Sequence, residues 1–184
     1  MTVVIRNARP GDAPAIARVQ VATWRSTYRG IIPDEYLDTM EEEPRAAWWR
    51  DVIARDSGAS DQAFIVVADD GERGVVGFAA GGPERTGDPQ FRGELGAIYI
   101  LEAYQRRGIG RRLVREVARR LLERGFDSML VWVLAENPFR AFYEALGGHR
   151  VRSRSIEIGG KTLEEWAYGW DDIRSLAGDS NIPS

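Results

Sequence analysis

The sequence of 184 residues contains no cysteine and a single histidine, His149. Disulfides, a thiol nucleophile and thiolate metal sites are therefore excluded, and one histidine is too few to build a histidine metal site. The lack of cysteine also fits a reducing compartment, so we expect a cytoplasmic protein. No run of about 20 apolar residues suggests a membrane-spanning helix. The first seven residues, Met-Thr-Val-Val-Ile-Arg-Asn, turn polar too early for a signal peptide.

Strong charge of either sign is also missing. The formal net charge is −3, with 43% hydrophobic and 29% charged residues, which is ordinary for a soluble globular chain. This balance gives no reason to expect nucleic acid as the main partner. The length fits one domain, which we predict over residues 1–177, followed by a frayed tail at 178–184. No Gly-x-Ser-x-Gly motif of a serine hydrolase is present.

The most informative stretch is the glycine-containing turn at residues 104–112, Tyr-Gln-Arg-Arg-Gly-Ile-Gly-Arg-Arg. Before it, residues 95–101 are short and apolar, which predicts a buried strand, and after it apolar residues recur at helical spacing. Glycines allow a sharp turn and the close approach of a ligand. The first amide groups of a helix lack partners and favour an anion. The stretch therefore predicts a phosphate site, with a tight turn that binds nothing as the alternative.

Two common phosphate loops do not match this turn. Arg111 and Arg112 stand where a Walker A loop needs Lys and Ser or Thr, and Leu113 replaces the third glycine of a dinucleotide-binding loop. The order Gln105-x-x-Gly108-x-Gly110 instead resembles the pyrophosphate loop of the GCN5-related N-acetyltransferases, the GNAT superfamily, which bind acetyl-CoA.

The predicted elements follow the order of that superfamily. A strand at 3–5 precedes helices at 12–30 and 42–55, a hairpin at 63–80, a strand at 94–100, the turn and its helix, a strand at 129–134, a helix at 139–146 and a hairpin at 150–170. This order predicts an α/β fold with a mixed sheet of about seven strands and helices on both faces. Residues 137–148, Asn-Pro-Phe-Arg-Ala-Phe-Tyr-Glu-Ala-Leu-Gly-Gly, resemble the second signature of the superfamily.

The resemblance implies acetyl-CoA as co-substrate and no metal. Pantetheine would lie like an extra strand between the strand before the turn and the next one, paired with backbone groups. The pyrophosphate would meet the amide groups of the turn, and an asparagine would contact the cofactor. The implied cofactor-binding residues are Ile98, Tyr99, Ile100, Arg106, Arg107, Gly108, Ile109, Gly110, Arg111 and Asn137.

The implied reaction is direct transfer of an acetyl group to a primary amine in a ternary complex. The amine must lose a proton and the departing thiolate must gain one. The resemblance gives Tyr143 the role of acid to the thiolate, although it could simply be a packed tyrosine. Glu94 matches the general-base glutamate of histone-type members, or else it is a carboxylate in solvent at a strand entry. Tyr99 and a water relay remain alternatives for the base.

The resemblance places the acceptor between the first helices and the last hairpin, which supply four aromatic candidates, although core packing would also explain them. An aromatic site with few acids argues weakly against polycationic acceptors. The acceptor itself stays unidentified, and a homodimer is plausible. A non-catalytic acyl-CoA sensor and an unrelated phosphate-binding enzyme remain alternatives to an N-acetyltransferase. The candidate acceptor residues are Trp24, Tyr28, Trp166 and Tyr168.

Overall fold

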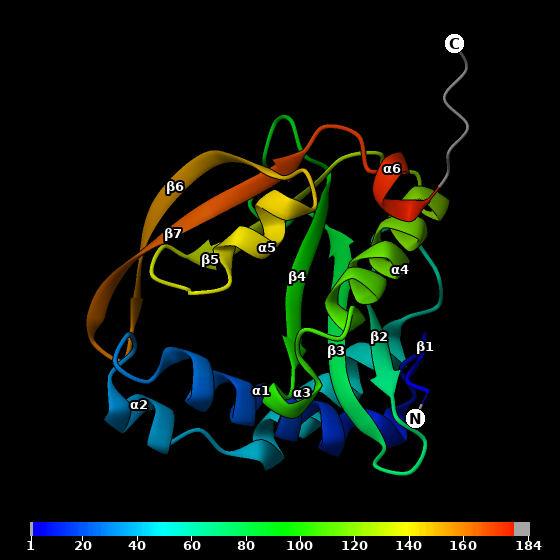
Figure 1. Ribbon diagram of the computed structural model, residues 1–184. Helices are drawn as coiled ribbons and strands as arrows, with labels where there is room; N and C mark the ends of the chain where they lie inside the picture. The colour runs from blue at the N-terminus through cyan, green and yellow to red at the C-terminus, as the bar shows by residue number, and fades with distance from the viewer. Residues whose placement is uncertain (1, 179–184) are drawn as a thin grey trace.

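The computed structural model describes residues 2–178. In this part of the chain a seven-stranded sheet has the order β1-β2-β3-β4-β5-β7-β6 (Figure 1). The predicted mixed sheet with flanking helices is confirmed. The strands are β1 Val4–Asn7, β2 Phe64–Asp69, β3 Val75–Pro83, β4 Gly93–Ile100, β5 Met129–Leu134, β6 His149–Ile158 and β7 Lys161–Trp170. The helices are α1 Ala13–Tyr28, α2 Asp34–Asp38, α3 Glu42–Arg55, α4 Ile109–Glu123, α5 Arg140–Ala145 and α6 Arg174–Ala177, with 3-10 turns η1 Pro10–Asp12 and η2 Glu102–Tyr104.

The helices cover both faces of the sheet because each has one apolar face. On α4, Leu113, Val117 and Leu121 are completely buried in the core beneath that helix. A second core on the opposite face joins α1 and α3 to β2 and β3. Asp12 occupies the N-cap position of α1, but its side chain caps no amide of that helix. Its carboxylate instead accepts a hydrogen bond from the Arg9 amide at 2.7 Å and pairs with Arg6.

The junction between β4 and β5 is the short parallel contact of the sheet. The two strands pair only at Gly93 with Met129 and at Glu94 with Leu130. Beyond these two positions no further pairing joins the two strands. The sheet therefore consists of two parts, β1–β4 and β5-β7-β6, that meet at one end and separate toward the other.

A bulge in β4 sets which side chains face this gap. The β3–β4 register passes from Ala80 opposite Ala97 to Gly81 opposite Leu95, which leaves Gly96 as the extra residue. Because of this extra residue, the residues of β4 after Gly96 face the opposite side of the sheet from the one that simple alternation from Leu95 would give. Leu95 therefore shares the α4 core with Ile98 and Ile100, whereas Ala97 and Tyr99 pack on the side of α1 and α3.

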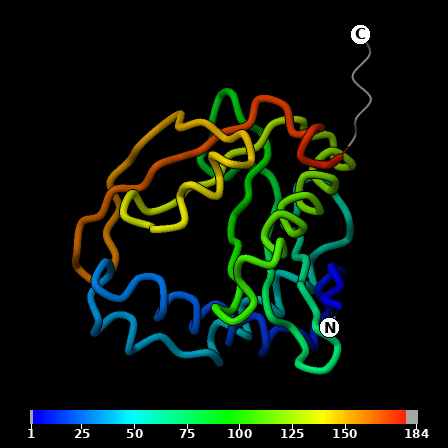
Figure 2. Tube along the Cα trace, in the orientation of Figure 1, coloured from blue at the N-terminus to red at the C-terminus, as the bar shows by residue number. Residues whose placement is uncertain are grey.

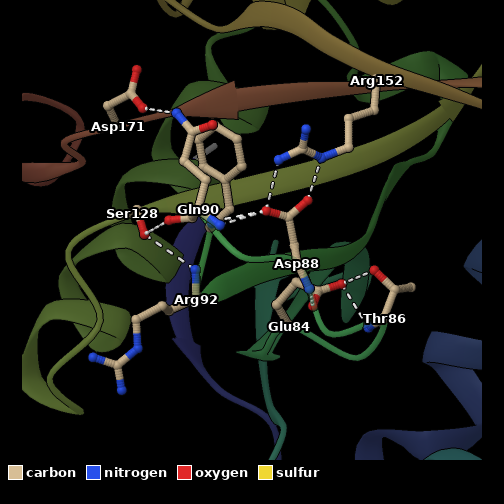
Figure 3. A network of polar contacts seen from close by, with 9 residues as sticks. Glu84, Thr86, Asp88, Gln90, Arg92, Ser128, Arg152 and Asp171 are labelled. Carbon is tan, nitrogen blue, oxygen red and sulfur yellow. Dashed lines mark hydrogen bonds and ion pairs between the residues drawn. The ribbon is translucent and has the colours of Figure 1, made fainter.

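The loop at 84–92 fastens the two parts of the sheet together (Figure 3). Asp88 accepts a hydrogen bond from Arg152 Nη2 at 3.0 Å, and the Arg92 amide donates to Ser128 Oγ at 3.1 Å. Phe91 is fully buried against Gly169, where a Cβ would lie 2.4 Å from its ring. The 84–92 loop therefore bridges the junction of β4 and β5 and holds the two parts of the sheet together there.

The β6–β7 hairpin reaches across to the first helices, as the traces in Figures 1 and 2 show. Gly159 and Gly160 form its turn with φ of +58° and +79°, as a two-residue type I′ turn requires. Lys161 Nζ donates to the Ile31 carbonyl at 2.7 Å, and the backbone of Gly159 packs against Tyr36. This contact closes one end of the molecule beside the gap.

The segment after β7 packs on the core. Ile173 is completely buried just before α6, which packs on α4, and Arg115 Nε donates to the Ala177 carbonyl at 3.2 Å. Gly178 ends this helix with φ of +82°. The rest of the predicted frayed tail, residues 179–184, lies outside the described residues. Within residues 2–178, none of the helices is both long and apolar enough to cross a membrane.

Candidate active site

A cavity of about 540 Å³ occupies the gap between β4 and β5. Its walls come from α1, from β4 after the bulge, from the glycine turn, from β5 and from α5. No acidic side chain is among its described lining residues. The lining residues are Thr23, Thr27, Tyr28, Gly96, Ala97, Ile98, Tyr99, Ile100, Gln105, Arg106, Gly108, Gly110, Arg111, Val131, Trp132, Val133, Asn137, Pro138, Phe139, Ala141, Phe142 and Tyr143.

The glycine turn forms one end of the cavity. Arg106 and Gly108 both adopt left-handed conformations, with φ of +59° and +76°, and α4 begins at Ile109. Alternation of left- and right-handed residues turns successive amide groups toward one point, where they bind an anion together with the helix N-terminus. Strain at a non-glycine residue such as Arg106 is typical of functional sites. Arg111 adds positive charge to the same end.

The turn is held from behind by side chains outside the cavity. Gln105 Nε2 donates to the Ile100 carbonyl at 3.0 Å, which ties the turn to the end of β4. The Tyr104 hydroxyl donates to the buried Asp70 carboxylate, and the Arg107 guanidinium stacks on the Tyr104 ring at 5.3 Å. Ile109 is buried in the core. The side chains of Arg107 and Ile109, predicted to bind the cofactor, therefore lie away from the cavity, and only their backbone is in the turn.

The cavity fits an extended acyl-CoA chain. Ile98, Tyr99 and Ile100 line it as predicted, on the edge of β4 that has no strand partner beyond Glu94. An unpaired strand edge offers amide and carbonyl groups to the amides of a pantetheine arm. Two buried polar side-chain atoms of the lining, Thr23 Oγ1 and Trp132 Nε1, have no hydrogen-bond partner among the described residues. A polar ligand would supply partners at this site.

Three tyrosines, Tyr28, Tyr99 and Tyr143, converge on the middle of the cavity from α1, β4 and α5. Burial raises the pKa of all three hydroxyls, and each of Tyr28 and Tyr143 is also affected by the proximity of Tyr99. All three therefore remain protonated at neutral pH and can donate hydrogen bonds. The Tyr143 hydroxyl makes no hydrogen bond within the described residues, so it is available to a ligand.

Asn137 connects two walls of the cavity. Its Oδ1 accepts a hydrogen bond from the Phe139 amide at 2.8 Å, and its Nδ2 donates to the Tyr28 hydroxyl at 3.2 Å. The predicted capping role is thus found one turn before α5, which starts at Arg140. The residue lines the cavity, but much of its hydrogen-bonding capacity is used within the protein.

Glu94, the predicted general base, is not brought to the cavity. It lies at the closed junction of β4 and β5, and its side chain is 5% exposed. Arg85 donates to both of its oxygens, from Nη2 at 2.7 Å and from Nε at 3.1 Å. A carboxylate that already accepts these bonds and lies outside the lining is not placed to take a proton from an amine in the cavity. The predicted alternative, a carboxylate in solvent at a strand entry, is also wrong, because the side chain is buried in its ion pair with Arg85.

Three of the four predicted acceptor aromatics also lie outside the lining. Trp24 packs edge-on against Tyr28 with ring centroids 5.2 Å apart, so it supports the wall from behind. Trp166 lies between Arg140 and Arg150, with their guanidinium carbons 4.5 and 3.7 Å from its ring. Tyr168 is buried under Tyr143, and its hydroxyl donates to Glu144 Oε1 at 3.1 Å. β7 thus turns these two rings toward α5 and the surface around it.

Sequence reasoning missed several lining residues. Thr23 and Thr27 stand one turn apart on α1, on the side of the helix that a projection from Tyr28 would have revealed. Gln105 belongs to the glycine-turn motif, but its side chain was not predicted to line the cavity. The position of Val131 and Val133 in the lining could not be predicted, because an apolar strand has the same sequence pattern whether it faces a core or a cavity.

Comparisons with known proteins agree with this geometry. Residues 20–148 match the acetyltransferase (GNAT) family. The chain is 39% identical over 174 residues to YuaI, an uncharacterized N-acetyltransferase of Bacillus subtilis, covering 95% of this chain and 96% of the relative. Among solved structures, PaiA N-acetyltransferase of Thermoplasma acidophilum in complex with coenzyme A has a TM-score of 0.69 at 19% identity, covering 90% and 98%. The acetyltransferase yncA of Salmonella typhimurium, with acetyl-CoA, has a TM-score of 0.67 at 20% identity, covering 92% and 94%.

A split mixed sheet with an anion-binding turn and a cavity in its gap is the arrangement of an acyltransferase that uses acyl-CoA. The chain belongs to the GNAT acetyltransferase family. The predicted family and the predicted enzyme class, an acetyl-CoA-dependent N-acetyltransferase, are confirmed.

Proposed function

We propose that this protein transfers the acetyl group of acetyl-CoA directly to a primary amine while both substrates occupy the cavity. The observation that carries the proposal is the convergence of Tyr28, Tyr99 and Tyr143 in a gap that begins at an anion-binding turn. Orientation of two bound substrates can supply much of the acceleration without a covalent enzyme intermediate. The lack of cysteine fits this direct route.

The binding roles follow from the walls of the cavity. The amides of residues 106–111 and the charges of Arg106 and Arg111 would hold the pyrophosphate, and the free edge of β4 at 98–100 would pair with the pantetheine amides. Bound in this way, acetyl-CoA supplies an activated acetyl group as a thioester. Two structural relatives hold coenzyme A or acetyl-CoA, which supports this assignment.

Tyr143 acts as the proton donor to the thiolate. When the amine nitrogen bonds to the acetyl carbon and the carbon–sulfur bond breaks, one proton must leave nitrogen and one must reach sulfur. The buried Tyr143 hydroxyl donates to sulfur and regains a proton that originates on nitrogen, so the phenol ends unchanged. Its raised pKa disfavours a lasting phenolate, so we expect the two proton movements to be coupled.

The acceptor ammonium first loses one proton to water, which leaves the neutral amine that attacks; the second nitrogen proton is the one that replaces the proton Tyr143 gives to sulfur. Glu94 is paired with Arg85 outside the cavity, and burial raises the pKa of Tyr99, so its hydroxyl stays protonated at neutral pH and does not serve as the base. Among the three alternatives for the base, a water relay along the cavity is the one that the described side chains favour.

The test begins with calorimetric titration of acetyl-CoA beside dephospho-CoA, ATP and NAD. We expect selective binding of acetyl-CoA. An amine panel is then read by thiol release, with Tyr143→Phe and, as a matched control, Tyr168→Phe, which removes a buried hydroxyl outside the cavity. The first variant should lower kcat by about 10²-fold or more at unchanged acetyl-CoA affinity. The control should keep its kcat.

Acetyl-CoA binding without transfer to any amine would instead support the acyl-CoA sensor. Equal kcat values for Tyr143→Phe and wild type would refute the acid role. A cytoplasmic location is proposed from the lack of cysteine, and a homodimer stays a prediction that sedimentation would test.

A further inference from the structure

A second cavity, also of about 540 Å³, lies between α1, α2 and α3. We call it the α2–α3 pocket, defined by Gln20, Tyr36, Met40, Glu41, Arg45 and Trp48. Trp48 is 55% exposed, so much of its large apolar ring lies in water. The ring packs edge-on against Trp49. An exposed aromatic wall beside polar groups is typical of a ligand site.

Two polar side chains of this pocket, Arg45 and Gln20, present hydrogen-bond donors that lack acceptors. Arg45 is half-buried and forms no ion pair or side-chain hydrogen bond within residues 2–178. Gln20 Oε1 accepts a hydrogen bond from Trp49 Nε1 at 2.8 Å. Since an indole nitrogen only donates, this bond fixes the orientation of the amide and leaves the Gln20 NH2 group free to donate. A guanidinium and an oriented amide in one pocket favour a carboxylate.

The pocket adjoins the main cavity along α1. Gln20 lies one helical turn before Thr23 and two turns before Thr27, which both line the main cavity, so the three share one side of the helix. Tyr99 also lines the main cavity, and the positive charge of Arg45 lowers its pKa against the larger effect of burial. A small molecule could therefore place one group in each cavity.

We propose that the α2–α3 pocket binds a carboxylate of the acceptor, so that the acceptor is a small molecule carrying both an amine and a carboxylate. This inference rests on the proposed function. Arg45 and the Gln20 amide bind the carboxylate, Trp48 contacts the apolar part, and the amine points to Tyr143. Glu41 lies at the exposed rim and opposes the bound negative charge.

A binding experiment tests the pocket without turnover. Indole N–H signals of Trp48 and Trp49 are followed by NMR in the full-length protein, assigned with Trp48→Phe, while 3-phenylpropionate or its primary amide is added up to about ten millimolar. We expect the carboxylate but not the amide to shift both signals. Arg45→Gln should weaken the carboxylate by about tenfold or more. Arg50→Gln, on the same helix but outside the pocket, should change nothing, and Glu41→Gln should tighten binding.

A kinetic experiment tests the link to acetylation. Amino acids of increasing amine–carboxylate separation are compared with their decarboxylated amines. Arg45→Gln should raise the KM for the amino acids by about tenfold, with kcat and acetyl-CoA affinity unchanged, and should leave the decarboxylated amines unaffected. Arg45→Lys should restore part of the loss.

The outcomes separate the two proposals. Shifts that are equal for carboxylate and amide, shifts that survive Arg45→Gln, or no shift at all would overturn the carboxylate pocket even if the enzyme is active. Failure to bind acetyl-CoA, or to acetylate any amine, would overturn the proposed function and leave the NMR result to decide the pocket alone.

Discussion

The conformation of Gly108 provides a quantitative test of the anion-binding turn. Its φ of +76° is left-handed, and a Cβ added there would meet nothing within 4 Å. Gly108→Ala therefore introduces backbone strain without a steric clash. A left-handed L-residue costs about 1–2 kcal/mol, which corresponds to a fall in Tm of about 2–8 °C for a chain of this size.

The same strain should reduce acetyl-CoA affinity. Strain that the free turn keeps lowers Tm, whereas strain that the free turn relieves by leaving the left-handed region must be restored on binding, and in that case the Kd rises by up to about 5–30-fold. Gly58→Ala is the matched control, since Gly58 has φ of +87°, also meets nothing within 4 Å, and lies away from the cavity. It should lower Tm similarly and leave the Kd unchanged. Tm is measured by calorimetric scanning and Kd by titration. An unchanged Kd in Gly108→Ala together with an unchanged Tm would refute the requirement for this conformation.

Two further predictions concern the junction of β4 and β5. Glu94→Gln removes an acceptor of the Arg85 hydrogen bonds, so we expect a loss of about 1–3 kcal/mol in urea unfolding with kcat retained; a fall in kcat of about 10²-fold would instead identify a base. The hydrogen bond from Arg152 holds the pKa of Asp88 below its usual value. This group therefore contributes stability above the ordinary aspartate pKa of about 3.9, and loses it as pH falls below that value. Asp88→Asn should be less stable at pH 7 and should lose less stability than wild type between pH 5 and pH 3; parallel losses would contradict the assignment.

The order of elements was predictable because their patterns are strong and local. The strand at 129–134 and the helix at 42–55 have the predicted bounds, since an apolar run or a helical period is enough to define each. α6 was not predicted because it is a single turn, too short for periodicity to show that Ile173 before it is buried.

The site was predictable where the backbone carries the function. The turn at 104–112 and the edge at 98–100 follow from a motif, and both line the cavity. Side chains were harder to place. The bulge at Gly96 changes which residues of β4 share a face, and alternation alone cannot reveal it. The ion pair of Glu94 with Arg85 could not be predicted, because Arg85 lies in a loop that has no periodic pattern. The packing of Trp166 against Arg140 and Arg150 likewise depends on tertiary contacts.

The loop at 84–92 gives this enzyme a remote point of mechanical weakness. The two parts of the sheet share only two residue pairs between β4 and β5, so the width of the gap depends on the fastening at its closed end. The ion pair of Asp88 with Arg152 (Figure 3) and the packing of Phe91 against Gly169 hold the two parts of the sheet together at that end. A mutational scan should therefore find substrate-affinity defects at these four residues, although they touch neither substrate.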